Sequence, residues 1–394
     1  MRKGSTRFCL IFSVCIAWSL CSLAPIWKYL SYTRAAITTL VALSSIGIGM
    51  HLLDRFNQRR LQISLRWFVL LYLVFVVAFA VLYPLSLKRT LNQRSDREDA
   101  LRIELVAIRH HQYPYEARTF LGNPPTPLPG ALLLAAPFFL MRHIAWQNCL
   151  WIAAFFYFTI RFFRFRSTAL FFVFILLLAS PSSLSDLTSG GDYLTNFFYL
   201  SVAVGFLVHS LDKPVYQAIS AALLVGLTLS SRSLYLVILI PLFALVLERA
   251  TRTRVVLILG VILATAAAVT FPVFMPHLIT HLHRHISQNA DKLLYMPSAL
   301  HAERTLPAVA LLISCLSLFI RMDMQRLFLI FGACSSVVLA PPVLAQGFQM
   351  HKLPYECSYL SISALSFCLW ALSRYEDSSS GVLPSAQNNL VTID

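Results

Sequence analysis

Residues 67–86 read WFVLLYLVFVVAFAVLYPLS, an apolar stretch without a single charged side chain. About 20 such residues in an α-helix span the hydrocarbon core of a bilayer, so the stretch predicts a transmembrane helix. Similar runs recur along nearly the whole chain of 394 residues, which is 58% hydrophobic. Only 12% of its residues are charged, whereas soluble domains have about 25%. The sequence therefore predicts an all-α, polytopic integral membrane protein.

The apolar runs predict about twelve membrane-spanning helices, within a range of 10–13 because several runs are short. The predicted spans are 8–27, 35–53, 67–86, 144–160, 168–184, 193–211, 215–231, 233–248, 255–275, 306–320, 327–345 and 355–373. We interpret the first run as an uncleaved helix, because no small-x-small cleavage site precedes a soluble domain.

Basic residues predict the orientation of these helices. With the N-terminus inside, 17 of the 32 lysines and arginines fall in cytoplasmic segments and four in short external connections. The other basic residues lie in two long predicted external loops, 87–143 and 276–305. Long loops are translocated across the membrane during insertion whatever their charge, so these residues do not oppose this orientation. The pattern predicts an N-in, C-in topology. The same rule explains the net charge of +15, so no nucleic-acid partner is expected.

The chain divides into three predicted regions. Residues 1–66 form an N-terminal transmembrane hairpin, residues 67–375 a membrane core with its external loops, and residues 376–394, rich in Ser, Asn and Gln, a disordered cytoplasmic tail. The eight cysteines contain no C-x-x-C pair, which argues against a zinc site or a disulfide framework. The chain also lacks a P-loop, a dinucleotide fingerprint, an H-E-x-x-H motif and an internal repeat.

Charged residues concentrate in the first external loop, so any chemistry is expected on the external side. Positions 88–118 hold Lys88, Arg89, Arg94, Asp96, Arg97, Glu98, Asp99, Arg102, Glu104, Arg109, Glu116 and Arg118. Ser95 and Glu98 have the spacing of a capping box at the start of a helix. Apolar Leu101, Leu105 and Ile108 follow at helical spacing, which predicts an amphipathic helix lying along the membrane surface.

Asp96 and Asp99, three residues apart, would share one face of this helix. Acidic residues in a first helical turn also stabilise the helix through its macrodipole, and basic neighbours can pair with them. For Asp96 and Asp99 the catalytic and the structural interpretation are both open. For Glu98 and Glu104 the structural interpretation is favoured.

This loop resembles the first catalytic loop of the GT-C superfamily of glycosyltransferases, in particular their bacterial mannosyltransferase-like branch. The similarity lies in an acidic pair after an outward-going helix, then Tyr113-Pro-Tyr115, then Gly122-Asn-Pro-Pro-Thr-Pro-Leu-Pro-Gly130, leading to 135–139. It extends over roughly residues 67–248. One departure is that the loop follows the third predicted helix, whereas in the family it commonly follows the first.

The resemblance implies a bacterial inner-membrane enzyme that takes a sugar from a polyprenyl-phosphate donor and transfers it to a lipid or glycan acceptor at the outer face. It implies that Asp99 or Asp96 acts as the general base or orients the acceptor hydroxyl. A carboxylate within hydrogen-bond reach can take the proton of a sugar hydroxyl. The leaving lipid phosphate requires cations or hydrogen-bond donors. No cofactor is implied, and nothing in the sequence supports a divalent metal.

Other segments match the family at lower specificity. Asp186 and Asp192 stand where the family often has a second external acid, although Asp192 is also a natural N-cap and Asp186 suits a turn. Arg232, at the predicted outer boundary, and Lys352 are the candidates for binding the donor phosphate. Arg232 equally suits a plain turn in which its side chain reaches the lipid headgroups.

The loop 276–305 contains His277, His281 and His285, which have metal-ligand spacing on a helix, but no carboxylate or cysteine accompanies them closely. We therefore predict no metal there. The alternative functions are a surface-polysaccharide polymerase or ligase, a secondary transporter, and a membrane protein without catalysis. The transporter is disfavoured because it would show an internal repeat and ionisable residues near the membrane midplane.

Overall fold

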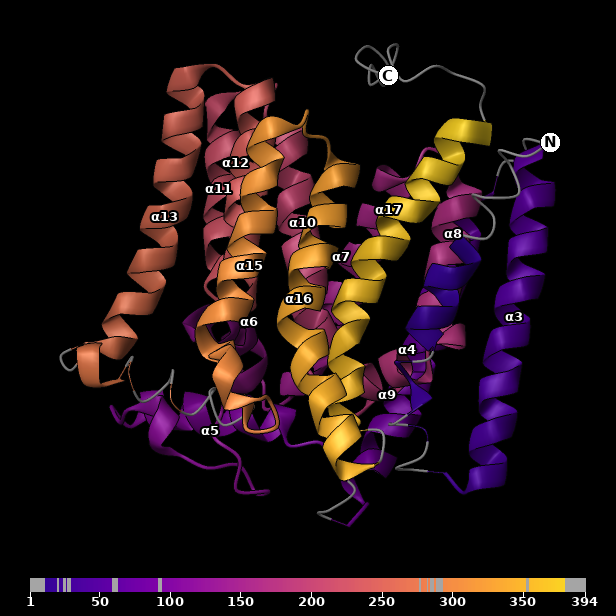
Figure 1. The fold of residues 1–394 in the computed structure, drawn as a ribbon, viewed down its shortest axis with the longest axis horizontal. Helices are drawn as coiled ribbons and strands as arrows, with labels where there is room; N and C mark the ends of the chain where they lie inside the picture. The colour runs from indigo at the N-terminus through magenta and orange to yellow at the C-terminus, as the bar shows by residue number, and fades with distance from the viewer. Residues whose placement is uncertain are drawn as a thin grey trace.

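The computed structural model describes residues 11–19, 21–23, 26, 30–58, 63–90, 94–275, 278–281, 283, 287, 293–351 and 354–379. Every regular element within these segments is a helix, as the composition predicted (Figure 1). The first half contains α3 (Tyr32–Gln58), α4 (Leu65–Leu87), α5 (Arg97–Arg109), η2 (Pro114–Glu116), α6 (Pro129–Leu140), η3 (Ile144–Trp146), α7 (Gln147–Phe162), α8 (Arg166–Phe174), η4 (Ile175–Ala179), α9 (Pro181–Thr188) and α10 (Tyr193–Ser210). The second half contains α11 (Val215–Leu229), η5 (Ser233–Ile238), α12 (Leu239–Arg249), α13 (Arg252–Phe274), η7 (Ser298–Leu300), α15 (Ala302–Leu316), η8 (Ser317–Phe319), α16 (Met324–Met350), η9 (Tyr355–Leu360) and α17 (Ser361–Ser379).

Six helices are long and apolar enough to cross a membrane, or up to eight if each of two bent helix pairs counts as one span. Helical residues occur in all twelve ranges predicted from the sequence. The remaining helices are shorter or less apolar than a typical span, so the count of twelve stays a prediction. The structure therefore supports a membrane-embedded helical protein.

Helix α4 shows why this fold requires lipid. Phe68, Phe75 and Phe79 are buried on one face, while apolar side chains such as Val69 and Val77 remain more than half exposed around the rest of the helix. A soluble protein rarely exposes so continuous an apolar surface. In a bilayer, the exposed face contacts acyl chains, and the helix satisfies its own backbone hydrogen bonds.

The predicted span 168–184 is broken in the structure. Its first part, α8 with η4, is followed by α9 after a bend of 76°. Pro181 has no N–H to continue the helix, and Ser180 precedes it in a non-helical conformation. Buried serines stabilise the bend: Ser22 Oγ donates to Ser182 Oγ at 3.1 Å, and the backbone N–H of Ser182 donates back to Ser22 Oγ at 3.1 Å.

The loop predicted to be the first external one, residues 87–143, is largely structured. It contains α5 and α6, and α6 is followed by the η3–α7 segment after a bend of 112°. Helix α6 begins directly against the end of α11, where the N–H of Gly130 donates to the carbonyl of Ser230 at 3.0 Å. A Cβ atom at position 130 would lie 2.2 Å from the carbonyl oxygen of Leu227, so only glycine allows this approach.

Long helices form the body of the molecule. Helix α11 packs against α10 and α13, and α16 packs against α15 and α17. Helix α5 lies across one end of this bundle, and α17 runs from that end to the opposite one (Figure 1). The predicted tail boundary at Glu376 falls inside α17, where the Glu376 carboxylate is buried and accepts the N–H groups of Arg164 and Phe165 at 2.9 and 2.8 Å. Residues 380–394 lie outside the described part of the chain.

Candidate functional site

Helix α5 is the amphipathic helix expected from the loop sequence. Leu101 and Leu105 are buried in a small core with residues of α6, while Ile108 is exposed. The apolar face therefore packs mainly on α6 rather than directly on the membrane. This contact fixes α5 across the end of the bundle and sets the direction of its charged side chains.

The capping box predicted for Ser95 and Glu98 does not form. Asp96 is the N-cap residue of α5, and Glu98 instead accepts a hydrogen bond from the Tyr83 hydroxyl on both oxygens, at 2.7 and 2.9 Å. Gly190, with φ of +79°, lies against the Glu98 carboxylate; a Cβ there would come within 2.6 Å of Oε2. Burial raises the pKa of Glu98 above its usual value, and the Tyr83 hydrogen bond opposes this. Glu98 thus joins α4 to α5 instead of capping the helix.

Asp96 and Asp99 both hold the turn at 119–123. Asp96 Oδ2 accepts from the Thr119 hydroxyl at 2.7 Å and from the Asn123 amide at 2.8 Å. Asp99 Oδ2 accepts from the backbone N–H of Phe120 at 2.9 Å, and its Oδ1 pairs with Arg102 at 2.6 Å. These contacts give both aspartates a structural function. They leave the catalytic prediction untested, because a carboxylate oxygen can accept more than one hydrogen bond.

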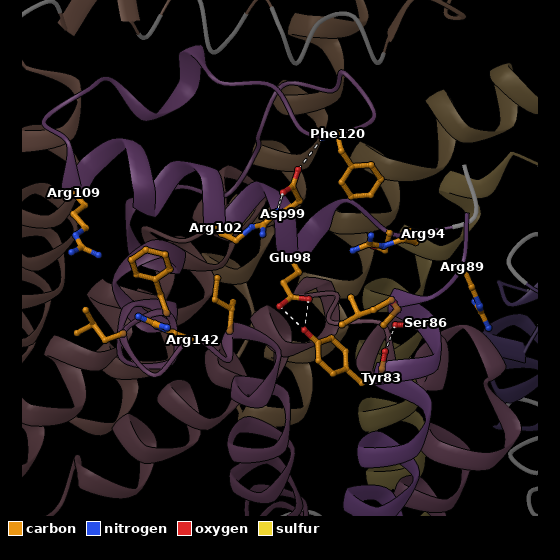
Figure 2. Close-up of a pocket in the computed structure, with 16 residues that line it drawn as sticks. Tyr83, Ser86, Arg89, Arg94, Glu98, Asp99, Arg102, Arg109, Phe120 and Arg142 are labelled. Carbon is orange, nitrogen blue, oxygen red and sulfur yellow. Dashed lines mark hydrogen bonds and ion pairs between the residues drawn. The ribbon is translucent and has the colours of Figure 1, made fainter. Parts of the chain in front are cut away.

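A pocket of about 660 Å³ opens beside the first turns of α5 (Figure 2). Glu98 and Asp99 face it together with the hydroxyl-bearing residues Tyr83 and Ser86 of α4. Apolar Leu87, Phe139, Leu140 and Ile144 complete part of the wall. Its cationic residues are Arg89, Arg94, Arg102, Arg109 and Arg142. We call this cavity the arginine pocket. Its chemistry suits an anionic group attached to an apolar chain.

Arg142 occupies an unusual backbone position in this pocket. Its φ is +62°, in the left-handed region, just after the end of α6. Glycine is the usual residue at such a helix C-terminus, and a side chain with a Cβ costs about 1–2 kcal/mol there. The left-handed backbone at this position places the Arg142 side chain in the lining of the pocket.

The predicted secondary acids are both paired with arginines. Asp186 forms an ion pair with Arg97 of α5 and accepts the N–H of Leu194 at 3.1 Å. Asp192 pairs with Arg232 at 2.6 Å, and its side chain makes no N-cap hydrogen bond to α10. Asp192 thus occupies the N-cap position of α10, as predicted, but its side chain does not cap the helix, and Asp186 accepts an N–H of the first turn of α10 instead.

Arg232 does not line the arginine pocket, and its predicted place at the outer membrane boundary stays a prediction. Its guanidinium donates to the Thr126 hydroxyl at 2.8 Å as well as to Asp192. The backbone N–H of Leu128 donates to the Ser231 carbonyl at 3.0 Å. The turn at 230–232 and the segment 126–130 are thus joined by side-chain and backbone contacts, and Arg232 is not a plain surface residue.

The burial of Glu104 is a feature that the sequence did not indicate. Its side chain is 0% exposed, and burial raises the pKa of its carboxyl well above the usual value. Neither carboxyl oxygen has a hydrogen-bond partner in the described segments. In the sequence it was indistinguishable from an ordinary exposed helix acid. Arg142 was missed similarly, because it lies 40 positions after Arg102 and only the bend between α6 and α7 brings it to the pocket.

The structure describes only some of the remaining candidate residues. Lys352, His277 and His285 lie outside the described residues. His281 stacks on Tyr113 with ring centroids 3.6 Å apart. Among the residues that the structure describes, no three His, Cys, Asp or Glu side chains are grouped as metal ligands would be. The prediction of no metal stays a prediction.

Searches of protein families, curated proteins and solved structures found no match to this chain.

Proposed function

We propose that the protein is a GT-C-like glycosyltransferase that moves a sugar from a polyprenyl-phosphate donor to a lipid or glycan acceptor at the outer face of a bacterial inner membrane. The observation that carries this proposal is the arginine pocket. It combines five arginines, two carboxylates and an apolar wall at the end of a lipid-exposed helix. These are the groups that a lipid-linked phosphate and a hydroxyl nucleophile require.

The donor phosphate binds among the arginines in this proposal. Guanidinium groups bind phosphate through paired hydrogen bonds and remain charged at all relevant pH values. We assign this role to Arg102 and Arg142 rather than to Arg232, because Arg232 does not line the arginine pocket. Leu87 and Leu140 continue the pocket wall, and both have exposed surface on which a polyprenyl chain can lie. Lys352 remains a second candidate cation.

The transfer step requires a base near the phosphate. The acceptor hydroxyl oxygen attacks the anomeric carbon, its proton moves to a carboxylate, and the bond from the anomeric carbon to the phosphate oxygen breaks. Polyprenyl phosphate then leaves as an anion, stabilised by the arginines. Asp99 is our preferred base because it lines the pocket beside Arg102, and Asp96 is the alternative. No step in this scheme requires a cofactor.

The test uses purified protein in liposomes with polyprenyl phosphate carrying a labelled sugar and with membrane extracts as the source of acceptor. Wild type should transfer the label. Arg102→Ala and Arg142→Ala should each transfer it at least about tenfold more slowly, the value of one hydrogen bond to a charged group. Arg118→Ala is the matched control, since Arg118 is an exposed arginine of the same loop that does not line the pocket. Equal rates in all four proteins would contradict the proposal.

A surface-polysaccharide polymerase or ligase is the second candidate. The number of arginines in the pocket favours it, because its carrier leaves as a diphosphate with more negative charge. The same liposomes, supplied with a polyprenyl-diphosphate oligosaccharide, distinguish the two functions. Transfer from the diphosphate carrier alone would assign the protein to the polymerase or ligase class.

A further inference from the structure

The arginines of the arginine pocket form two groups, one on each side of the carboxylates of Glu98 and Asp99 (Figure 2). The first group comes from α5 and from the end of α6, and consists of Arg102, Arg109 and Arg142. The second group comes from the link between α4 and α5, and consists of Arg89 and Arg94. In the proposed function the donor phosphate binds the first group. The second group is therefore available for another ligand.

The pocket is long enough to hold two phosphate groups. Arg94 precedes α5, whose last residue is Arg109, and a helix of 13 residues rises roughly 20 Å. A phosphate oxygen lies within about 3 Å of the guanidinium nitrogen that binds it. An anion that bridged the two groups at the centre of the pocket would lie against the carboxylates of Glu98 and Asp99. The geometry therefore favours two separate anion sites.

Each group of arginines has its own exposed apolar side chain. Leu140, two residues before Arg142, is 76% exposed, and Leu87, two residues before Arg89, is 40% exposed. Both leucines line the pocket. Leu87 is also the last residue of α4, the helix with the continuous exposed apolar surface. A cation next to such a surface suits a lipid whose headgroup is anionic. With the donor chain on Leu140, Leu87 serves a second lipid.

Asp99 lies between the two groups of arginines. Its Oδ1 pairs with Arg102 of the first group at 2.6 Å. Its Oδ2 accepts the backbone N–H of Phe120 at 2.9 Å, and Cζ of Arg94 lies 5.3 Å from the centre of the Phe120 ring. The proposed base thus has an arginine of the donor side on one oxygen and, through Phe120, an arginine of the other side next to its second oxygen.

We infer that the acceptor is itself a lipid, whose headgroup phosphate binds Arg89 and Arg94. This inference rests on the proposed function and names the class of its acceptor. A hydroxyl oxygen of the same headgroup attacks the anomeric carbon of the donor sugar, and its proton moves to Asp99. The bond from the anomeric carbon to the donor phosphate breaks, and its electron pair leaves with polyprenyl phosphate. A glycerophospholipid and a polyprenyl-diphosphate glycan both present this chemistry.

Native mass spectrometry of the full-length protein in detergent tests the inference, because it counts each bound lipid. The protein is first saturated with bare polyprenyl phosphate. The acceptor probes are phosphatidylglycerol and a polyprenyl-diphosphate disaccharide, and zwitterionic phosphatidylcholine is the control lipid. Wild type is compared with Arg94→Gln and with Arg89→Gln, which changes an exposed residue and provides the test if Arg94→Gln does not fold. Arg118→Gln, at an exposed position of the same loop outside the pocket, is the control variant.

Wild type and Arg118→Gln should bind polyprenyl phosphate together with one of the two acceptor probes, and the probe that binds identifies the source. Arg89→Gln and Arg94→Gln should each bind that probe at least about tenfold more weakly and polyprenyl phosphate like wild type. Arg142→Gln should show the reverse pattern. Phosphatidylcholine should bind equally to all five proteins.

Displacement of both acceptor probes by polyprenyl phosphate would overturn the inference and leave the proposed function standing. Arg89 and Arg94 variants that bind the probe like wild type would have the same consequence. Failure of wild type to bind polyprenyl phosphate would overturn both the inference and the proposed function.

Discussion

Arg142 combines backbone strain with a position in the arginine pocket. We predict that Arg142→Gly relieves the strain and leaves the free energy of unfolding unchanged or up to about 1 kcal/mol higher. The same change should weaken binding of polyprenyl phosphate, because one guanidinium is lost. Thermal unfolding and equilibrium binding check the two effects separately. Arg142→Lys, which retains both the strain and a charge, is the control; unaltered binding in Arg142→Gly would exclude Arg142 from the phosphate site.

Asp99 has a structural function in the turn at 119–123 and a proposed catalytic one. Asp99→Asn retains an oxygen for the Phe120 N–H but loses the charge that pairs with Arg102. Arg102 is 63% exposed, so the lost pair should cost no more than about 1 kcal/mol of stability. Loss of a positioned base should instead slow transfer roughly 100- to 10,000-fold. Rates and melting temperatures measured together distinguish the two functions.

Two neighbouring variants serve as comparisons for Asp99→Asn. Asp96→Asn should show the same loss or a milder one. Glu98→Gln should transfer at nearly the wild-type rate, since glutamine still accepts a hydrogen bond from the Tyr83 hydroxyl. Wild-type transfer by Asp99→Asn and Asp96→Asn alike would make both aspartates structural and direct the search for the base to Asp186 or Asp192.

At the scale of elements, Glu376 of α17 joins the last helix to the turn between α7 and α8. Burial raises the pKa of Glu376 to about 7. An acid whose pKa is raised by folding stabilises the fold most below its unfolded pKa, and this contribution is lost as the pH rises through 7. We therefore predict that wild type loses about 1–3 kcal/mol relative to Glu376→Gln between pH 5 and pH 8. Melting curves of both proteins at the two pH values provide the measurement, and a difference that is constant with pH would refute it.

The sequence predicted the helices more reliably than the contacts between them. Apolar runs located the helices because a lipid-facing helix needs an apolar surface whatever its neighbours are. Helix α5 was also predictable, from the spacing of Leu101 and Leu105. The bends at Ser180 and between α6 and α7 were not, and neither was the contact of Gly130 with α11. These features depend on side chains distant in sequence, such as Ser22, and a pattern within one segment contains no information about them.

For the candidate site, too, the sequence indicated the residues of one segment but not their contacts. The accumulation of charges in 88–118 correctly indicated that Glu98 and Asp99 lie near several arginines. It did not distinguish Glu98, bound to Tyr83, from a capping residue, and it gave no reason to single out Glu104. Burial decides both cases, and burial here results from the packing of α5 on α6 and on the end of the bundle.

For the whole molecule, the predicted N-in topology places α5 and the arginine pocket outside the cell. The join between α12 and α13 lies at the end of the bundle opposite α5 (Figure 1). Reporter fusions after Arg60, Arg166 and Arg254 should therefore report the cytoplasm, and a fusion near Gly122 the exterior. A cytoplasmic signal at Gly122 would contradict the proposed transferase, whose lipid-linked donor is expected on the outer face.

The transfer of a sugar from polyprenyl phosphate is the central claim, and mass analysis of lipids and surface glycans tests it most directly. Cells lacking the gene are compared with cells that produce wild type or Asp99→Asn at equal membrane levels. We predict that cells without the gene accumulate one polyprenyl-phosphate sugar and lose one hexose or pentose from a lipid or glycan. Wild type should restore the normal pattern, and Asp99→Asn should not. Identical lipids and glycans with and without the gene would contradict the claim.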